Sequence, residues 1–291
     1  MKDFSRVQRI LWIIFFLNLI VALVKIILGA LFINSSSLTA DGYHSLSDGA
    51  SNIVGLIGIR LASRPVDNDH PYGHRKFETL AALLISGILF LLGINVITEA
   101  VQKILHPAAP KVTIESLIAL IVTLIINIFV TKIEYRKGVE LNSQILISDS
   151  LHTRSDVYIS LGVLLTLTGI MLGLPPIIDP LVSLIVAGFI FHAAYKIFVM
   201  NRDILVDKAV IQEDRIKEII MSFDEVKNTH SIRSRGSNSA LFIDMHVMTR
   251  PDLSIEESHL LIHRIEDRIR QDINDNAQIT THLEPYEENS R

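Results

Sequence analysis

Long runs of apolar residues follow one another along the chain up to about residue 200. Each run is about as long as the roughly 20 apolar residues that a helix needs to cross a lipid bilayer. The runs are apolar all round rather than along one stripe, which favours membrane helices over the one-sided helices of a soluble domain. The sequence therefore predicts six transmembrane helices. They are Ile10 to Ile33, Leu38 to Leu61, Phe77 to Ala100, Ile114 to Lys132, Ile145 to Leu172 and Ile177 to Val199.

After the last run the pattern changes to shorter segments separated by polar turns. Ser254 and Glu257 have the spacing of a capping box at the start of one predicted helix. We therefore expect a membrane α-helical domain at residues 1–201 and a small soluble α+β domain at residues 202–291. The predicted order of the second domain is helix, strand, strand, helix, strand, over residues 211–223, 229–234, 240–248, 254–273 and 277–284.

Composition and charge support this division. The chain is 49% hydrophobic and its mean hydropathy is +0.40, as expected for a membrane protein. Residues 201–291 carry 18 acidic and 12 basic side chains, so the second domain is soluble and acidic. The chain has no cysteine, which excludes disulfides and thiolate metal sites. We expect no nucleic-acid partner.

Basic residues predict the orientation of the membrane domain. They gather before the first run and in the connections after the second and fourth runs, and such segments stay in the cytoplasm. We therefore expect an integral protein of a prokaryotic inner (cell) membrane, with both termini in the cytoplasm. The residues are Lys2, Arg6, Arg9, Arg64, Arg75, Lys76, Arg136 and Lys137.

The pattern Asp-x-x-His-x-x-Ser-Asp occurs twice, at residues 41–48 and 149–156, in the second and fifth runs. On a helix the two Asp and the His of each copy share one face. If the two helices pack together, two imidazoles and two carboxylates meet, which is a full tetrahedral set for a zinc-like ion. The predicted intramembrane metal site is His44, Asp48, His152 and Asp156.

Three further charged residues of the membrane domain have roles that the pattern leaves open. Asp41 and Asp149 each lie one turn before a site histidine, where they orient the imidazole, relay protons or cap a helix. Lys25 in the first run either pairs with a carboxylate or extends toward the membrane surface.

The connection after the second run contains Asp67, His70 and His74, and we expect a short helical turn to present them as an accessory metal site.

Together these features resemble the cation diffusion facilitator family. The resemblance rests on the six runs, the paired His-x-x-x-Asp segments, the loop Asp67-Asn-Asp-His-Pro-Tyr-Gly-His-Arg-Lys-Phe-Glu78 and the small second domain. It implies a homodimeric transporter that exports zinc-like divalent cations from the cytoplasm in exchange for protons. It also implies a metallochaperone-like cytoplasmic domain that binds metal and aids dimerisation.

The resemblance also implies metal ligands in the second domain. Glu284 stands where the family commonly has Asp, and His263 lies one turn after His259 and is an alternative to it. The implied ligands are His230, His246, His259, His282 and Glu284.

The predicted function is divalent cation efflux by proton-coupled alternating access, with Zn²⁺ as the expected substrate, no enzymatic activity and no prosthetic group. A metalloenzyme would need an open coordination position and a nearby base, and the His-Glu-x-x-His motif is absent. Two alternatives remain: a membrane-bound metal sensor, and the same transporter class with Fe²⁺, Mn²⁺, Co²⁺, Cd²⁺ or Ni²⁺ as its main substrate.

Overall fold

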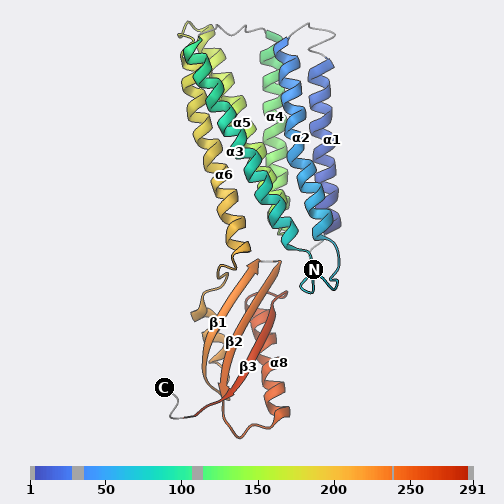
Figure 1. Ribbon diagram of the computed structural model, residues 1–291, viewed down its shortest axis with the longest axis vertical. Coiled ribbons are helices and arrows are strands. Elements are labelled where there is room, and N and C mark those ends of the chain that lie inside the picture. The colour runs from blue at the N-terminus through green and yellow to red at the C-terminus, as the bar shows by residue number, and fades with distance from the viewer. Residues whose placement is uncertain (1–3, 28–35, 107–113, 238, 288–291) are drawn as a thin grey trace. The chain divides into compact units, whose positions relative to one another are not determined.

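The computed structural model describes residues 4–27, 36–106, 114–237 and 239–287. Within these residues the chain forms two compact units, which divide between Asn201 and Arg202. The first unit is a bundle of long helices (Figure 1). They are α1 (Phe4–Ile27), α2 (Ser36–Ala62), α3 (Lys76–Leu105), α4 (Ile114–Glu140), α5 (Gln144–Met171) and α6 (Ile178–Leu205).

Three helices of this unit are long and apolar enough to cross a membrane, judged by length and composition over the described residues. They are α1 over Phe4–Val24, α3 and α6. α1 begins at Phe4 rather than at Ile10, and α4 continues to Glu140, well past the predicted end at Lys132. These differences arise because charged residues end a hydrophobic run without ending a helix.

α5 contacts α2, α3 and α4. At its start, the Ser143 hydroxyl accepts a hydrogen bond from the Leu146 N–H and donates one to Glu78 Oε1 of α3 at 2.7 Å. Gly58 of α2 permits close approach to α3, because a Cβ there would lie 2.2 Å from the Cβ of Ala81. These contacts tie both α5 and α2 to α3, and α2 and α5 also contact each other.

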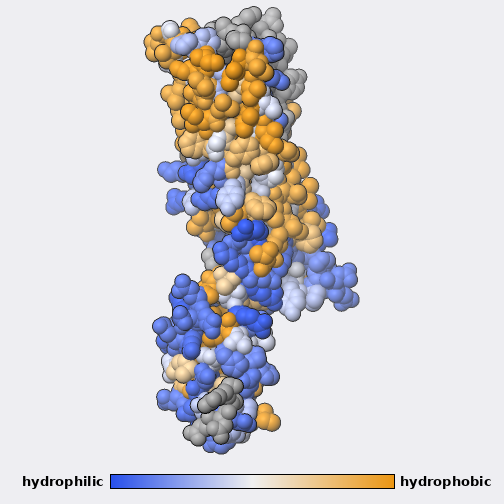
Figure 2. Space-filling model, turned by 60° about the vertical axis from the view of Figure 1, so that its left-hand side comes forward, coloured by the Kyte–Doolittle hydropathy of each residue, from blue (hydrophilic) through white to orange (hydrophobic). Residues whose placement is uncertain are grey.

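Much of the outer surface of the bundle is apolar. Hydrophobic side chains cover much of the helical unit on the face seen in Figure 2. Phe129 of α4 is 64% exposed and Ile185 of α6 is 62% exposed, although both are large and apolar. Such a surface is stable only when hydrocarbon rather than water surrounds it.

The second unit is a three-stranded sheet with two helices. β2 pairs antiparallel with β1 and parallel with β3, and α8 forms the crossover between β2 and β3. The predicted capping box is present at the start of α8, where Ser254 and Glu257 bond reciprocally. The elements are α7 (Glu213–Ile220), β1 (Val226–Ser237), β2 (Ala240–Thr249), α8 (Ile255–Asp272) and β3 (Gln278–Pro285).

Alternation along β2 separates the two faces of this sheet. Leu241, Ile243, Met245 and Val247 are buried and pack with apolar residues of α7 and α8. The intervening positions, including His246, lie on the opposite face, which is only half-buried. The sheet therefore has a core-forming face under the helices and a second face that carries polar side chains.

Candidate metal sites

Three histidines form a row across the second face of the sheet. The strand register places His230 of β1 opposite His246 of β2, and His246 opposite His282 of β3. Neighbouring rings lie 5.0 Å and 4.9 Å apart between centroids. Glu284 follows His282 by two residues on the same strand and therefore lies on the same face.

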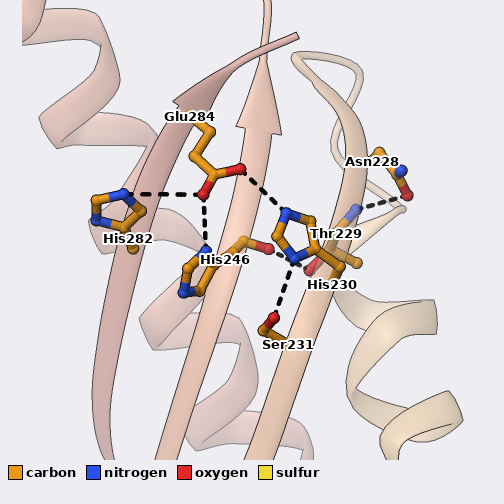
Figure 3. Close-up of polar contacts among 7 residues, drawn as sticks. All are labelled: Asn228, Thr229, His230, Ser231, His246, His282 and Glu284. Carbon is orange, nitrogen blue, oxygen red and sulfur yellow. Dashed lines mark hydrogen bonds and ion pairs between the residues drawn. The ribbon is translucent and has the colours of Figure 1, made fainter. Parts of the chain in front are cut away.

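The Glu284 carboxylate joins this row (Figure 3). His246 Nδ1 donates to Glu284 Oε1 at 2.7 Å, and His230 Nε2 donates to Oε2 at 3.0 Å. The hydrogen bond from His246, followed by that from His230, holds the pKa of the Glu284 carboxyl below its usual range. Ligand atoms of His230, His246 and Glu284 all lie within 4.8 Å of one another, so these three residues are arranged to share one ion.

His282 lies at the margin of this group, whereas His259 lies in the other layer of the unit. His282 Nε2 is 3.8 Å from Glu284 Oε1, and its side chain is 67% exposed. His259 is on α8 and does not join the sheet group among the described residues. Its Nε2 is instead 3.1 Å from Nε2 of His263, one turn further along the same helix.

Asp67, His70 and His74 also converge, with ligand atoms within 4.8 Å of one another. The expected helical turn is not present, because Pro71 and Gly73, whose φ is +82°, make this segment a series of turns. Asp67 Oδ1 accepts from the backbone N–H of His70 at 2.7 Å, and this turn brings the two imidazoles together with ring centroids 4.2 Å apart.

His74 presents one ring nitrogen to this loop site. Its Nδ1 donates to the Pro65 carbonyl at 3.0 Å, so in a neutral ring Nε2 carries a lone pair. Nε2 lies 3.4 Å from Asp67 Oδ2. Partial desolvation raises the pKa of the Asp67 carboxyl, but hydrogen bonds from His70 and the nearby His74 lower it overall. A nitrogen lone pair and a carboxylate oxygen at this distance are arranged to share a metal ion.

The repeated motif lies on α2 and α5, which contact each other. The side chains of Asp41, His44 and Asp48 lie outside the described residues, and so does that of Lys25. In α5, His152 is 3% exposed. Neither of its ring nitrogens has a hydrogen-bond partner in the part of the chain that the structure describes. A buried imidazole without such partners is suited to ligate an ion.

Asp149 belongs to a polar chain that links three helices. Its Oδ2 accepts from Asn52 Nδ2 of α2 at 2.7 Å, and Asn52 Oδ1 accepts from Asn18 Nδ2 of α1 at 3.0 Å. Ser143, and not Asp149, caps α5. Of the roles left open for Asp149, helix capping is therefore wrong, and its carboxylate ties α5 to α2.

Comparison with known families identifies the chain. Residues 11–206 match the family model described as the cation efflux transmembrane domain, and residues 210–286 match the cation efflux protein cytoplasmic domain. The chain belongs to the cation efflux, or cation diffusion facilitator, family. Family membership and the predicted fold class, a helical transmembrane domain followed by a small cytoplasmic α+β domain, are thereby confirmed.

Relatives within the cation efflux family are similar over most of this chain. An uncharacterized transporter of Methanocaldococcus jannaschii, MJ0449, is 32% identical over 258 residues, which cover 87% of this chain and 89% of that protein. The manganese efflux system protein MneP of Bacillus subtilis is 28% identical over 278 residues, covering 92% and 93%. Metal tolerance protein C1 of Arabidopsis thaliana is 32% identical over 273 residues, covering 86% of this chain and 57% of that protein.

One buried carboxylate of the cation efflux transmembrane domain is missing from the predicted sites. Glu134 of α4 is 0% exposed, and its Oε2 accepts from Thr153 Oγ1 of α5 at 3.1 Å. Its Oε1 has no hydrogen-bond partner among the described residues, and the charges of Asp149 and Asp156 act on it. The available signal was a glutamate two residues after the fourth apolar run, followed by Tyr135 with no Gly or Pro between them to end the helix.

Proposed function

We propose that this cation efflux protein carries Zn²⁺ out of the cytoplasm through a site formed by His44, Asp48, His152 and Asp156. The contact between α2 and α5 supports the site, because it brings the two copies of the motif onto neighbouring helices. The observation that carries the proposal is His152, which is buried with both ring nitrogens unbonded to any described residue. Buried polar groups are normally bonded, so this imidazole is ready to bind a ligand.

Zinc is the proposed substrate because of the ligand types. Two imidazoles and two carboxylates suit a borderline ion, whereas Mn²⁺ gains less from nitrogen ligands. The relative MneP is named for manganese efflux, so Mn²⁺ is the alternative substrate within the same mechanism. A metal series distinguishes the two.

Proton exchange follows from the same ligands. An imidazole binds metal only when neutral, and a carboxylate only when ionised, so protons compete with the metal for all four groups. In an alternating-access cycle the site takes metal from the cytoplasm and, after the helices rearrange, loses it to protons on the outer side. We further propose that the protein lies in the cell membrane with both termini in the cytoplasm.

The protein is proposed to work as a homodimer. The name of the family model that matches residues 210–286 includes the word dimer, which supports contact between the cytoplasmic domains of two chains. The sheet site at Glu284 and the loop site at Asp67 are proposed as accessory sites that bind metal on its way to the membrane site. A membrane-bound sensor would need only these accessory sites and would move no metal.

Zinc flux into sealed vesicles tests the proposal. The full chain is purified, reconstituted without other proteins and loaded with a fluorescent zinc indicator inside the vesicles. We expect zinc uptake that accelerates when the vesicle interior is more acidic than the outside, and zinc uptake faster than manganese uptake. Zinc binding without uptake would favour the sensor, and uptake independent of the pH gradient would remove proton exchange from the mechanism.

A further inference from the structure

A cavity of about 530 Å³ opens on the outer surface of the helical unit, between α4 and α5. α4 lines it with positions at three- and four-residue spacing between Ile128 and Arg136, and α5 does so between Ser150 and Tyr158. That spacing places each set on one face of its helix. Ile128 is 50% exposed and Tyr135 is 53% exposed, so the cavity is a surface groove accessible to molecules around the protein.

The charges in this groove are all positive. Lys132, Arg136 and Arg154 line it, and no carboxylate belongs to its lining. Lys137 lies next to Arg136 in sequence, but it does not line the groove and pairs with Glu140 at 2.7 Å. Three cations gathered around one space repel one another unless an anion lies among them.

The rest of the groove is apolar or aromatic. Ile128, Leu151 and Val157 form hydrocarbon walls, and the tyrosines Tyr135 and Tyr158 come from opposite sides. Tyrosine is enriched where the hydrocarbon of a bilayer meets its headgroups. A ligand that fits both parts needs an anionic head and a hydrocarbon tail.

The setting of the groove decides between a lipid and a free anion. Lys132 stands at the end of the apolar run of α4, and Arg136 follows one turn later. Earlier in the same helix, Ile125 and Phe129 are 61% and 64% exposed and face the surroundings of the bundle. A free phosphate would meet the three cations but would leave the apolar walls uncovered, whereas a phospholipid covers both.

We propose that the groove between α4 and α5 is a binding site for an anionic phospholipid, whose phosphate lies among Lys132, Arg136 and Arg154 while an acyl chain follows α4. Phosphatidylglycerol has the required chemistry. Each lysine or arginine near a membrane surface adds to the attraction of anionic lipid. Removal of two of the three cations should therefore reduce the preference for anionic over neutral lipid by roughly tenfold or more.

Lipid retention by the purified full chain tests this proposal without any transport measurement. Protein in neutral detergent is titrated with phosphatidylglycerol or phosphatidylcholine, and the lipid bound per chain is counted by native mass spectrometry. We expect wild type to prefer phosphatidylglycerol and Lys132→Gln/Arg136→Gln to lose that preference. Lys196→Gln, at an exposed lysine of α6 outside the groove, is the matched control and should keep it.

A second variant tests the shape of the groove rather than its charge. Ile128→Trp fills the apolar wall and leaves all three cations in place, so it should also reduce phosphatidylglycerol binding. Equal binding of the two lipids by wild type, unchanged preference in Lys132→Gln/Arg136→Gln, or an equal loss in Lys196→Gln would overturn the proposal. Displacement of the lipid by inorganic phosphate at similar concentration would also overturn it, because the site would then be one for free anions.

Discussion

The buried surroundings of His152 and the sheet site at Glu284 both combine imidazole with carboxylate groups, but the hydrogen bonding of the histidines differs between them. At the sheet, Glu284 already accepts from His246 and His230, so an entering ion must replace two hydrogen bonds. In the membrane domain, His152 is buried, with 3% of its surface exposed, and yet it has no hydrogen bond to a described residue. We therefore assign the transported ion to the buried group as a proposal, whereas the exposed group is stable without an ion.

The largest expected effect is at His152. His152→Gln removes one nitrogen ligand from a buried site, so zinc uptake into vesicles should fall to the background rate. His192→Gln is the matched control, because His192 also lies on a helix of the membrane unit but is exposed. Near-normal uptake by His152→Gln would show that the transported ion does not touch this ring, and the contrast between the two regions would disappear.

Glu134 should have the next largest effect. Glu134→Ala removes a buried acceptor of Thr153 and should lower the free energy of unfolding by about 1–3 kcal/mol relative to Glu134→Gln. Denaturant unfolding in detergent measures this difference. Glu134→Gln keeps the size and the acceptor but loses the charge, so we expect folded protein with zinc flux slowed several-fold. Unchanged flux in Glu134→Gln would make Glu134 structural only.

At the sheet site the length of the acidic side chain should matter. The Glu284 carboxylate reaches both His246 and His230, and Glu284→Asp withdraws it by roughly the 1.5 Å of one carbon–carbon bond. Zinc affinity of the cytoplasmic domain should fall about tenfold or more, as for other displaced partners of metal ligands. Isothermal titration of the full chain with zinc measures the loss of affinity. Equal zinc affinity in wild type and Glu284→Asp would remove Glu284 from the ligand set.

The smallest effect concerns pH in the absence of metal. The pKa of the Glu284 carboxyl is lowered by its hydrogen bonds from His246 and His230, so these bonds stabilise the folded chain at pH values above the usual carboxyl range. That stability is lost as the pH falls through the lowered pKa. Wild type should therefore unfold at a higher temperature than Glu284→Gln at neutral pH, and this difference should disappear below about pH 4. A difference in unfolding temperature that grows as the pH falls would contradict this prediction.

Periodicity predicts the elements well, and its errors have physical causes. Both helices and all three strands of the cytoplasmic domain lie where apolar spacing places them, because their burial is one-sided. Hydropathy ended the fourth predicted helix at Lys132, although α4 continues to Glu140. Glu134 was therefore missed, since a charge that ends an apolar run looks like the start of a loop.

The candidate sites depend on geometry that spacing alone does not contain. The row from His230 to His282 follows from strand register, and a shift of one residue would turn His246 into the core. His259 is also near His246 in the sequence, but it lies on α8, which forms the other layer of the unit. At the loop, Pro71 and Gly73 were visible signals against the expected helical turn, and they explain why turns replace it.

The most direct test of the account compares one variant from each region in the same assay. Initial rates of zinc uptake are measured for Asp156→Ala and Glu284→Gln in vesicles that contain equal amounts of folded protein. The account predicts background uptake for Asp156→Ala and most of the wild-type rate for Glu284→Gln, because only the membrane site holds the ion during transport. The reverse result, with uptake retained in Asp156→Ala and lost in Glu284→Gln, would contradict it.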